Sequence, residues 1–176
     1  MSIVKINSLG ITYPVSFSAG TVSLPSITTS GDTNTGIFFS TADTIDFAEG
    51  GVATGQFDSS GNFKFNSGFG SVGTAYGCRA WIKFNGTGTP AINGSGNVTS
   101  ITDIGTGQYT VNFTNAMPDT NYSLQASADD ATGAGICLVS PYATASQQTT
   151  TSSRIRVWST GFALVDSLMI CISFFR

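Results

Sequence analysis

Two stretches in the middle of the chain alternate apolar and polar residues, and they restrict the possible folds more than any other feature. In residues 78–85 (CRAWIKFN) and 108–114 (QYTVNFT), nearly every second side chain is apolar. A period of two places successive side chains on opposite faces of an extended chain, so each stretch predicts a half-buried β-strand. Glycines within 86–88, 94–96 and 105–107 predict turns that fold the chain back on itself. The pattern predicts the front half of an antiparallel β-sandwich.

Further strands are predicted in the last third of the chain. Residues 121–128 alternate in the same way, and residues 136–140 and 154–158 predict two more short strands. Residues 168–175 are apolar on nearly both faces, which suits a strand with the sandwich core on one side and a subunit contact on the other. No stretch of the sequence has sustained helical periodicity. The prediction is therefore an all-β knob, a sandwich of jelly-roll or immunoglobulin-like type.

Residues 21–66 carry many large apolar side chains for their length. Short strands are predicted at 36–39, 44–48, 52–57 and 62–65, with polar turns between them. Such a thin meander cannot bury its apolar side chains within one chain, whereas packing against identical copies would bury them. We therefore predict an intertwined trimeric β collar. Its predicted interface residues are Ile37, Phe38, Phe39, Ile45, Phe47, Phe57, Phe63 and Phe65.

The remaining segments complete the predicted domain organisation. Residues 1–20 contain too few apolar positions for a core of their own and predict an N-terminal attachment arm. Residues 67–77 are rich in glycine and predict a linker to the knob at 78–176. The sequence begins without the basic and long apolar regions of a signal peptide, and no apolar run is long enough for a transmembrane helix. Membrane insertion is therefore not expected.

The titratable residues argue against an enzyme. The sequence contains no histidine, and Glu49 is its single glutamate. Glycan hydrolysis usually needs two carboxylates across a cleft, but the obvious pair, Asp129 and Asp130, are neighbours whose side chains point to opposite sides of an extended chain. A carboxylate pair formed between subunits remains the alternative. We expect no catalytic residues, no cofactor and no metal site. The net charge of −3 also argues against nucleic acid and disfavours a strongly anionic ligand.

Residues suited to binding a sugar are concentrated in the knob. Carbohydrate sites often combine an aromatic ring that stacks on the sugar with nearby hydrogen-bonding side chains. The candidate receptor-binding residues are Tyr142, Arg154, Arg156, Trp158, Asp129, Asp130 and Trp81. For Trp81 and Trp158, burial on the second face of the sheet or between subunits is the favoured interpretation. For Tyr142 both interpretations stay open.

Several short phrases occur in fixed order along the predicted sandwich: CRAW, FNGTG, SGNV, SITD, GQYTVNF and AMPDTNY. Together they resemble the C-terminal knob of bacteriophage tail fibre proteins over about residues 76–128. The phrases SGDTNTGIFF and IDFAEGG, earlier in the chain, resemble collar or shaft segments of trimeric phage fibres. No exact internal repeat is present, which argues against a long repetitive shaft.

The resemblance implies a homotrimeric virion component. Its N-terminus would attach to a phage tail or baseplate protein, and its knob would recognise a host cell-surface glycan or lipopolysaccharide. Cys78, Cys137 and Cys171 are expected to be buried reduced thiols, which suits assembly in the reducing cytoplasm of the host. A purely structural tail or baseplate adaptor without receptor binding is the alternative. A third possibility, a glycan-degrading tailspike, is disfavoured by the short chain and the scarcity of acidic residues.

Overall fold

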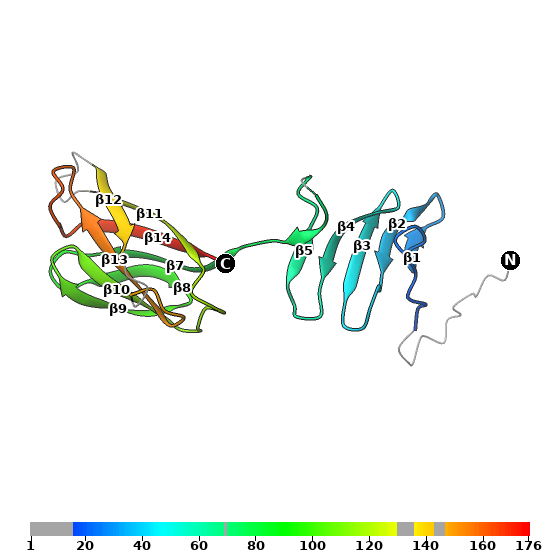
Figure 1. Cartoon of the computed structure of the whole chain (residues 1–176), viewed down its shortest axis with the longest axis horizontal. Helices are drawn as coiled ribbons and strands as arrows, with labels where there is room; N and C mark the ends of the chain where they lie inside the picture. Colours follow the sequence, from blue (N-terminus) through cyan, green and yellow to red (C-terminus); the bar gives the residue numbers. More distant parts are fainter. Residues whose placement is uncertain (1–15, 69, 130–135, 143–146) are drawn as a thin grey trace, which may run out of the picture. The chain divides into compact units, whose positions relative to one another are not determined.

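The computed structural model describes residues 16–68, 70–129, 136–142 and 147–176, which contain fourteen β-strands and no α-helix. The all-β prediction is therefore confirmed. The chain divides into two compact units, Met1–Ala75 and Tyr76–Arg176, which are treated separately below (Figure 1). Most of the predicted attachment arm, residues 1–15, lies outside the described residues. None of the described residues belongs to a helix with the length and hydropathy needed to span a membrane.

The first unit is a six-stranded antiparallel meander in which each strand pairs with its neighbours in sequence (Figure 1). Its strands are β1 (Ile27–Thr29), β2 (Asp32–Phe38), β3 (Ile45–Glu49), β4 (Val52–Phe57), β5 (Phe63–Phe65) and β6 (Gly73–Thr74). Strand β6 falls within the segment predicted as a linker, where it pairs with β5. Strand β2 begins four residues before the predicted strand, in the polar DTNT sequence.

Pairing register gives this sheet two different faces. Ile27 pairs with Ile37 and Ile37 with Phe47, so these side chains point to the same side, as do the paired residues Phe57 and Phe63. We call this side the apolar stripe. It consists of Ile27, Ile37, Ile45, Phe47, Phe57, Phe63 and Phe65. The opposite side carries a row of mainly polar residues that starts at Phe38 and continues through Asp46, Gln56, Lys64 and Thr74.

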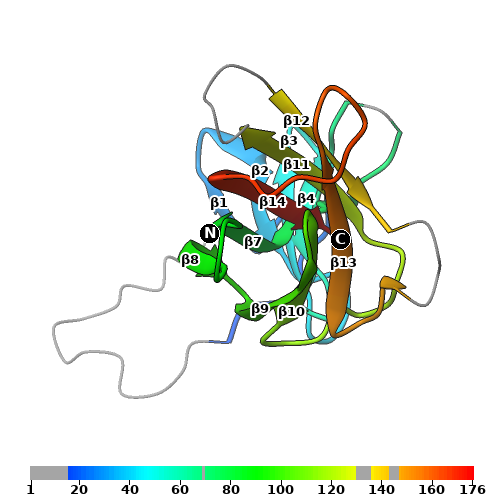
Figure 2. The ribbon, with the colours of Figure 1, turned by 90° about the vertical axis from the view of Figure 1, so that its left-hand side faces the viewer.

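The second unit is an eight-stranded sheet in the order β8-β7-β14-β11-β12-β13-β10-β9. Its strands are β7 (Cys78–Asn85), β8 (Ala91–Gly96), β9 (Val98–Gly105), β10 (Gln108–Phe113), β11 (Ser123–Asp129), β12 (Ile136–Pro141), β13 (Ser152–Trp158) and β14 (Met169–Phe175). Figure 2 shows these strands following one another around the unit. The sheet is a nearly closed barrel with a sandwich-like arrangement, which agrees with the predicted fold class.

Asn97 joins the two ends of this sheet, β8 and β9. Its backbone is in the left-handed region with φ 56°, where asparagine is better tolerated than most residues. Its side-chain amide donates hydrogen bonds of 3.1 Å to the carbonyl oxygens of Arg79 and Asn115, and its Oδ1 accepts one of 2.8 Å from the Asn115 amide. Asn97 therefore connects the turn to two segments distant in sequence.

The barrel interior is filled by the apolar residues of the alternating strands. Phe113, Tyr122 and Phe174 form a mutual edge-to-face cluster, with ring centroids 5.0–5.9 Å apart. Phe84 meets the ring of Tyr109 at 5.2 Å. Burial raises the pKa of Tyr109, and its hydroxyl lies 2.9 Å from the carbonyl oxygen of Gly86 and 2.6 Å from Oδ1 of Asp166, both of which are placed to accept its one proton. This arrangement satisfies the hydroxyl's hydrogen bonding inside the core.

Two local predictions for this unit are wrong. Residues 94–96, predicted as a turn, are part of β8, where glycine is required because a Cβ atom on Gly96 would lie 2.4 Å from Nε1 of Trp81. Cys78, expected to be a buried thiol with Cys137 and Cys171, is exposed at the start of β7. Position 78 begins the strand, so the alternation that buries Ala80 ends before it reaches the cysteine.

Candidate functional site

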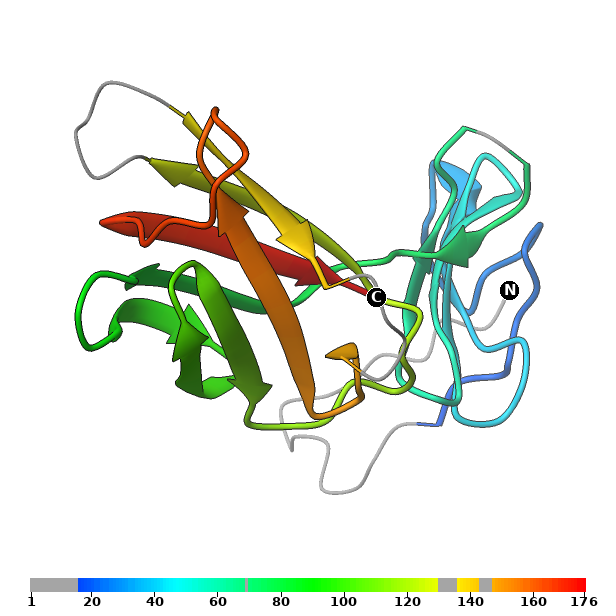
Figure 3. The same ribbon diagram turned by 60° about the vertical axis from the view of Figure 1, so that its left-hand side comes forward.

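The outer face of β13 brings together four of the seven predicted receptor-binding residues. Along β13 buried side chains alternate with half-buried ones, so Arg154, Arg156 and Trp158 all point away from the core. Figure 3 shows β13 in orange between β12 in yellow and β10 in green. The outward-facing side chains of these strands, together with Tyr142, which follows β12, form a group that we call the Arg–Tyr face. It consists of Gln108, Ser140, Tyr142, Arg154, Arg156 and Trp158.

Tyr142 is the centre of this face. Its backbone amide donates a 3.0 Å hydrogen bond to the carbonyl oxygen of Arg154, which continues the pairing of β12 with β13. The guanidinium carbons of Arg154 and Arg156 both lie 4.4 Å from the centroid of its ring. The Arg156 guanidinium is also 5.2 Å from the Trp158 ring. These distances fall within the range of cation–π interactions, which restrict the rotamers of both arginines.

The two arginines differ in their hydrogen bonding. Arg154 donates 3.1 Å to Oε1 of Gln108 and 3.5 Å to Oε1 of Gln147. Arg156 donates no side-chain hydrogen bond to any described residue, and the buried Nε atoms of both arginines have no acceptor there. Neither guanidinium forms an ion pair within the described part of the chain, where the ion pairs are Lys64–Asp58 and Arg176–Asp119.

Neutral polar groups surround the charged centre of the face. Nε1 of Trp158 donates a 3.1 Å hydrogen bond to Oγ of Ser140, which orients the indole ring. On the adjoining β10, the Asn112 amide donates 3.1 Å and 3.0 Å hydrogen bonds to hydroxyls of Ser100 and Thr102. The surface therefore combines aromatic rings, guanidinium donors and ordered amide and hydroxyl groups. Such a surface can stack on a sugar ring and hydrogen-bond its hydroxyls.

The other three candidates lie elsewhere or outside the described residues. Asp129 is on β11, which β12 separates from β13, and Asp130 is not described. Trp81 is 47% exposed on the outside of β7, so it is not buried on the second face of the sheet within one chain, whereas its burial between subunits stays a prediction. The indole of Trp81 lies over Gly94 and Gly96 of β8, with its other parts open to solvent.

The sequence did not identify an apolar hollow beside the Arg–Tyr face. It has a volume of about 290 Å³ and is lined by Cys137, Leu138, Ser159, Thr160 and Phe162. Leu138 pairs with Trp158 across the strands, so the hollow adjoins the tryptophan end of the face. Phe162 is 81% exposed on its loop. The sequence carried no signal for this hollow, because a single exposed apolar residue such as Phe162 is common on protein surfaces.

In the first unit, the apolar stripe remains open to solvent in the single chain. Phe57, Phe63 and Phe65 are each more than 40% exposed, and Phe63 lies between the other two at ring-centroid distances of 5.3 Å and 6.4 Å. Six of the eight predicted interface residues lie on this stripe; Phe39 follows the end of β2 and is not part of the stripe, and Phe38 does not lie on it either. Phe38 is on the opposite face and only 6% exposed within one chain, so it contributes to folding of the unit.

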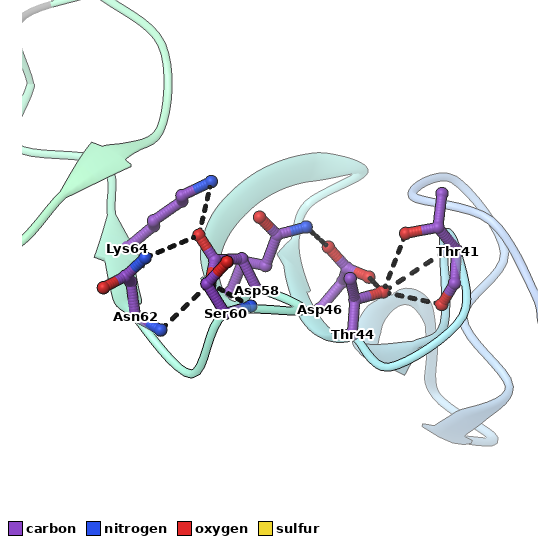
Figure 4. Close-up of polar contacts among 8 residues, drawn as sticks. Thr41, Thr44, Asp46, Asp58, Ser60, Asn62 and Lys64 are labelled. Atoms are coloured by element: carbon purple, nitrogen blue, oxygen red, sulfur yellow. Dashed lines mark hydrogen bonds and ion pairs between the residues drawn. The ribbon is translucent and has the colours of Figure 1, made fainter.

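The opposite face of this sheet is organised around two carboxylates, shown in Figure 4. Asp46 accepts hydrogen bonds from Gln56 Nε2 at 2.6 Å, from the Ser40 amide and hydroxyl at 2.9 Å and 2.8 Å, and from Thr44 Oγ1 at 3.1 Å. Burial alone would raise the pKa of Asp46, but these hydrogen bonds outweigh it and lower the pKa. Asp58 pairs with Lys64 at 2.9 Å, and that contact lowers the pKa of Asp58.

The lowered pKa values of Asp46 and Asp58 predict that acid destabilises the first unit. A folded-state pKa below the unfolded value means that the stabilisation is present above about pH 4 and is lost as the pH falls through the folded pKa. Calorimetric unfolding between about pH 6 and pH 2 should show this loss. Asp46→Asn should reduce the pH dependence and cost about 1–3 kcal/mol near neutrality by disrupting the network. Asp32→Asn, at an exposed position of β2, is the matched control, and an equal change in that variant would contradict the assignment.

The carboxylates whose contacts are described have structural roles. Asp119 pairs with Arg176 at 2.5 Å, and Asp166 accepts from the Gly107 amide at 2.8 Å and from the Tyr109 hydroxyl at 2.6 Å. Among the described residues there is no cluster of three or more Cys, Asp or Glu side chains that could hold a metal ion.

The comparisons with known proteins give little further information. No family model and no curated protein matches the sequence. A solved structure that matches is the phiAB6 tailspike in complex with oligosaccharides of Acinetobacter baumannii surface polysaccharide, at 15% identity and a TM-score of 0.46. The match covers 99% of this chain and 30% of the tailspike chain, so this chain spans less than a third of that protein. A likeness at this TM-score is too distant to carry an argument about function.

Proposed function

We propose that this protein is a non-enzymatic phage tail fibre protein whose second unit binds a glycan of the host cell surface. The observation that carries the glycan-binding part is the Arg–Tyr face, where Tyr142 and Trp158 flank Arg156 within 5.2 Å. The tail fibre assignment rests on the sequence phrases of residues 76–128 and on the all-β architecture that they imply. The virion tail is then the site of action.

The composition of the face favours a sugar over an apolar ligand. Aromatic rings stack on the apolar faces of sugars, and the neighbouring guanidinium, amide and hydroxyl groups can bond to sugar hydroxyls. Because cation–π contacts and the Trp158–Ser140 hydrogen bond already hold these side chains, less conformational entropy is lost on binding.

We propose further that the protein is a homotrimer held together through the first unit. The apolar stripe extends across five paired strands and leaves large rings exposed in one copy. Exposed apolar surface of this kind on a single-layer sheet favours aggregation unless another surface covers it. A second and a third copy supply identical stripes, and closed cyclic symmetry lets all three be covered at once. The number three comes from the resemblance to trimeric fibres.

The glycan proposal predicts the effect of a single substitution. Tyr142→Ala removes the ring that contacts both arginines, and should lower affinity for the recognised polysaccharide by about tenfold or more, since loss of one stacking aromatic typically costs over 1 kcal/mol. The measurement is binding of the purified full chain to an array of bacterial surface polysaccharides. Tyr76→Ala, which removes another tyrosine near an arginine, is the matched control.

Incubating the full chain with the same polysaccharides also distinguishes glycan binding from glycan degradation and from a purely structural role. Release of oligosaccharide from a bound polysaccharide, abolished by an aspartate substitution, would contradict the non-enzymatic proposal. Absence of binding to every polysaccharide and to intact host cells would instead support the structural adaptor. Unchanged binding by Tyr142→Ala would contradict the location of the site while leaving the glycan function in place.

Attachment to the phage tail or baseplate is assigned to the N-terminal residues. The carbonyl oxygen of Ser18 accepts a hydrogen bond from the Ser26 hydroxyl, and that of Ala19 accepts one from the Phe39 amide. A deletion should therefore stop before Ser18. Removing residues 1–15 should leave both units folded and still able to bind polysaccharide, but should prevent incorporation into virions. Particle content is measured by quantifying the protein in purified phage from complemented infections. Normal incorporation of the shortened chain would place attachment elsewhere.

A further inference from the structure

We propose that the glycan bound by the Arg–Tyr face carries a carboxylate, and that the guanidinium of Arg156 receives it. This inference rests on the proposed glycan-binding function and names the chemical class of the ligand. A single acidic sugar in a repeating unit, such as a uronic acid, has the required chemistry.

The first observation is the unsatisfied state of Arg156. Its side chain is half-buried, its Nε is shielded from solvent, and its guanidinium has no acceptor among the described residues. A buried donor without an acceptor is costly, and native structures usually satisfy such groups. Nε of Arg154, two residues earlier on the same face, is likewise buried without an acceptor, but glutamine oxygens accept hydrogen bonds from both of its terminal nitrogens. The terminal N–H donors without an acceptor among the described residues are therefore those of Arg156.

The second observation is the way in which Arg156 is held. Tyr142 and Trp158 contact the guanidinium at 4.4 Å and 5.2 Å from their ring centroids. Contacts to aromatic rings use the electron-rich ring surface and leave the N–H donors available for an acceptor. A carboxylate is planar and accepts two parallel hydrogen bonds from a guanidinium, and it carries less charge than a phosphate group, which can bind in the same way. The rings on each side can stack on the sugar that carries it.

The charge of the whole chain limits the ligand to a modest charge density. The net charge of −3 opposes a densely charged polyanion. That field is screened over a Debye length of about 8 Å at physiological salt, whereas a direct guanidinium–carboxylate contact is not. One carboxylate within an otherwise neutral saccharide experiences little repulsion from the net charge and still forms the direct contact with the guanidinium.

An acidic side chain of another copy is the alternative occupant, and the surroundings argue against it. The neighbours of Arg156 on paired strands, Gln108 and Ser140, are neutral hydrogen-bonding residues. Subunit contacts have more apolar centres, and the chain has such a surface in the apolar stripe of its first unit. A polar face with restrained aromatic rings is better suited to a saccharide.

The test compares two ligands that differ only at the relevant group. Methyl β-D-glucuronide and methyl β-D-glucoside have the same ring, with a carboxylate in one and a hydroxymethyl group in the other. Ligand-observed NMR titration of the full chain should give about tenfold tighter binding of the glucuronide, as expected for a charge-assisted hydrogen bond. Arg156→Gln should remove this preference and retain weak glucoside binding. Arg156→Lys should keep little of the preference, because lysine lacks the planar fork.

Arg79 is an exposed arginine on β7 and serves as the control position. Arg79→Gln removes the same charge and should leave the preference for the glucuronide unchanged. Equal binding of both sugars by the unmodified protein would overturn the carboxylate inference while leaving glycan binding intact. Binding of neither sugar, together with no polysaccharide binding, would overturn both proposals. If Arg156→Gln dissociates the oligomer, the face is a subunit contact and the inference is wrong. Thermal unfolding of each variant checks that the fold is preserved.

Discussion

Replacing Phe63 with aspartate should convert the assembled protein into separate or aggregated chains. Phe63 is the middle ring of the stack formed with Phe57 and Phe65, and it is 46% exposed in one copy. In the proposed trimer that surface is covered by other copies, so Phe63→Asp would bury an unpaired carboxylate at three equivalent sites. The effective penalty for burying an unpaired charge is several kcal/mol for each site, which is enough to abolish assembly.

Two variants make this prediction specific. Phe63→Leu keeps an apolar side chain and should assemble, whereas Ser59→Asp adds the same charge at an exposed turn and should also assemble. Assembly is measured by multi-angle light scattering on the purified variants. An assembled Phe63→Asp protein of unchanged mass would show that the apolar stripe is not the subunit contact.

The second large effect is expected in the barrel core. Phe174 is fully buried and lies 5.0 Å from the ring of Phe113 and 5.9 Å from that of Tyr122. Phe174→Ala should destabilise the second unit by about 3–5 kcal/mol, because it removes a large buried ring and leaves a cavity among two others. Phe175→Ala, at the next position of β14, changes a half-buried ring on the other face and should cost much less.

Tryptophan fluorescence can follow this unfolding selectively. Trp81 and Trp158 are the two tryptophans of the chain, and both belong to the second unit. Denaturant titrations of the two alanine variants should therefore report the stability of that unit alone. Similar stabilities for Phe174→Ala and Phe175→Ala would contradict the observed division between core and surface.

The alternation of apolar and polar residues correctly predicted strands that have one buried face and one more exposed face. Residues 78–85 and 108–114 contain strands β7 and β10 because one face is core and the other is polar. Strand β8 was not predicted, since its AINGSG sequence resembles a turn. Its glycines instead accommodate the indole of Trp81 from the neighbouring strand. A contact between strands gives no signal in the local sequence, so glycine could not be assigned to a strand from its neighbours alone.

The candidate sites depended on pairing register in a similar way. Arg154, Arg156 and Trp158 share a face because their spacing of two is visible in the sequence. The sequence did not predict that Tyr142 lies on the same face, because its position depends on how β12 pairs with β13. Composition likewise selected Phe38 for the subunit contact, whereas register places it opposite the apolar stripe. Register depends on the partner strand, which a single segment does not specify.

Native mass spectrometry of the unmodified full chain at micromolar concentration tests the proposed architecture most directly. The exposed rings of the apolar stripe require a covering surface, and the proposal supplies it from two further copies of the chain. The predicted result is a single species with three times the mass of one chain. A stable, monodisperse monomer would contradict the trimeric architecture and would require another partner for the stripe.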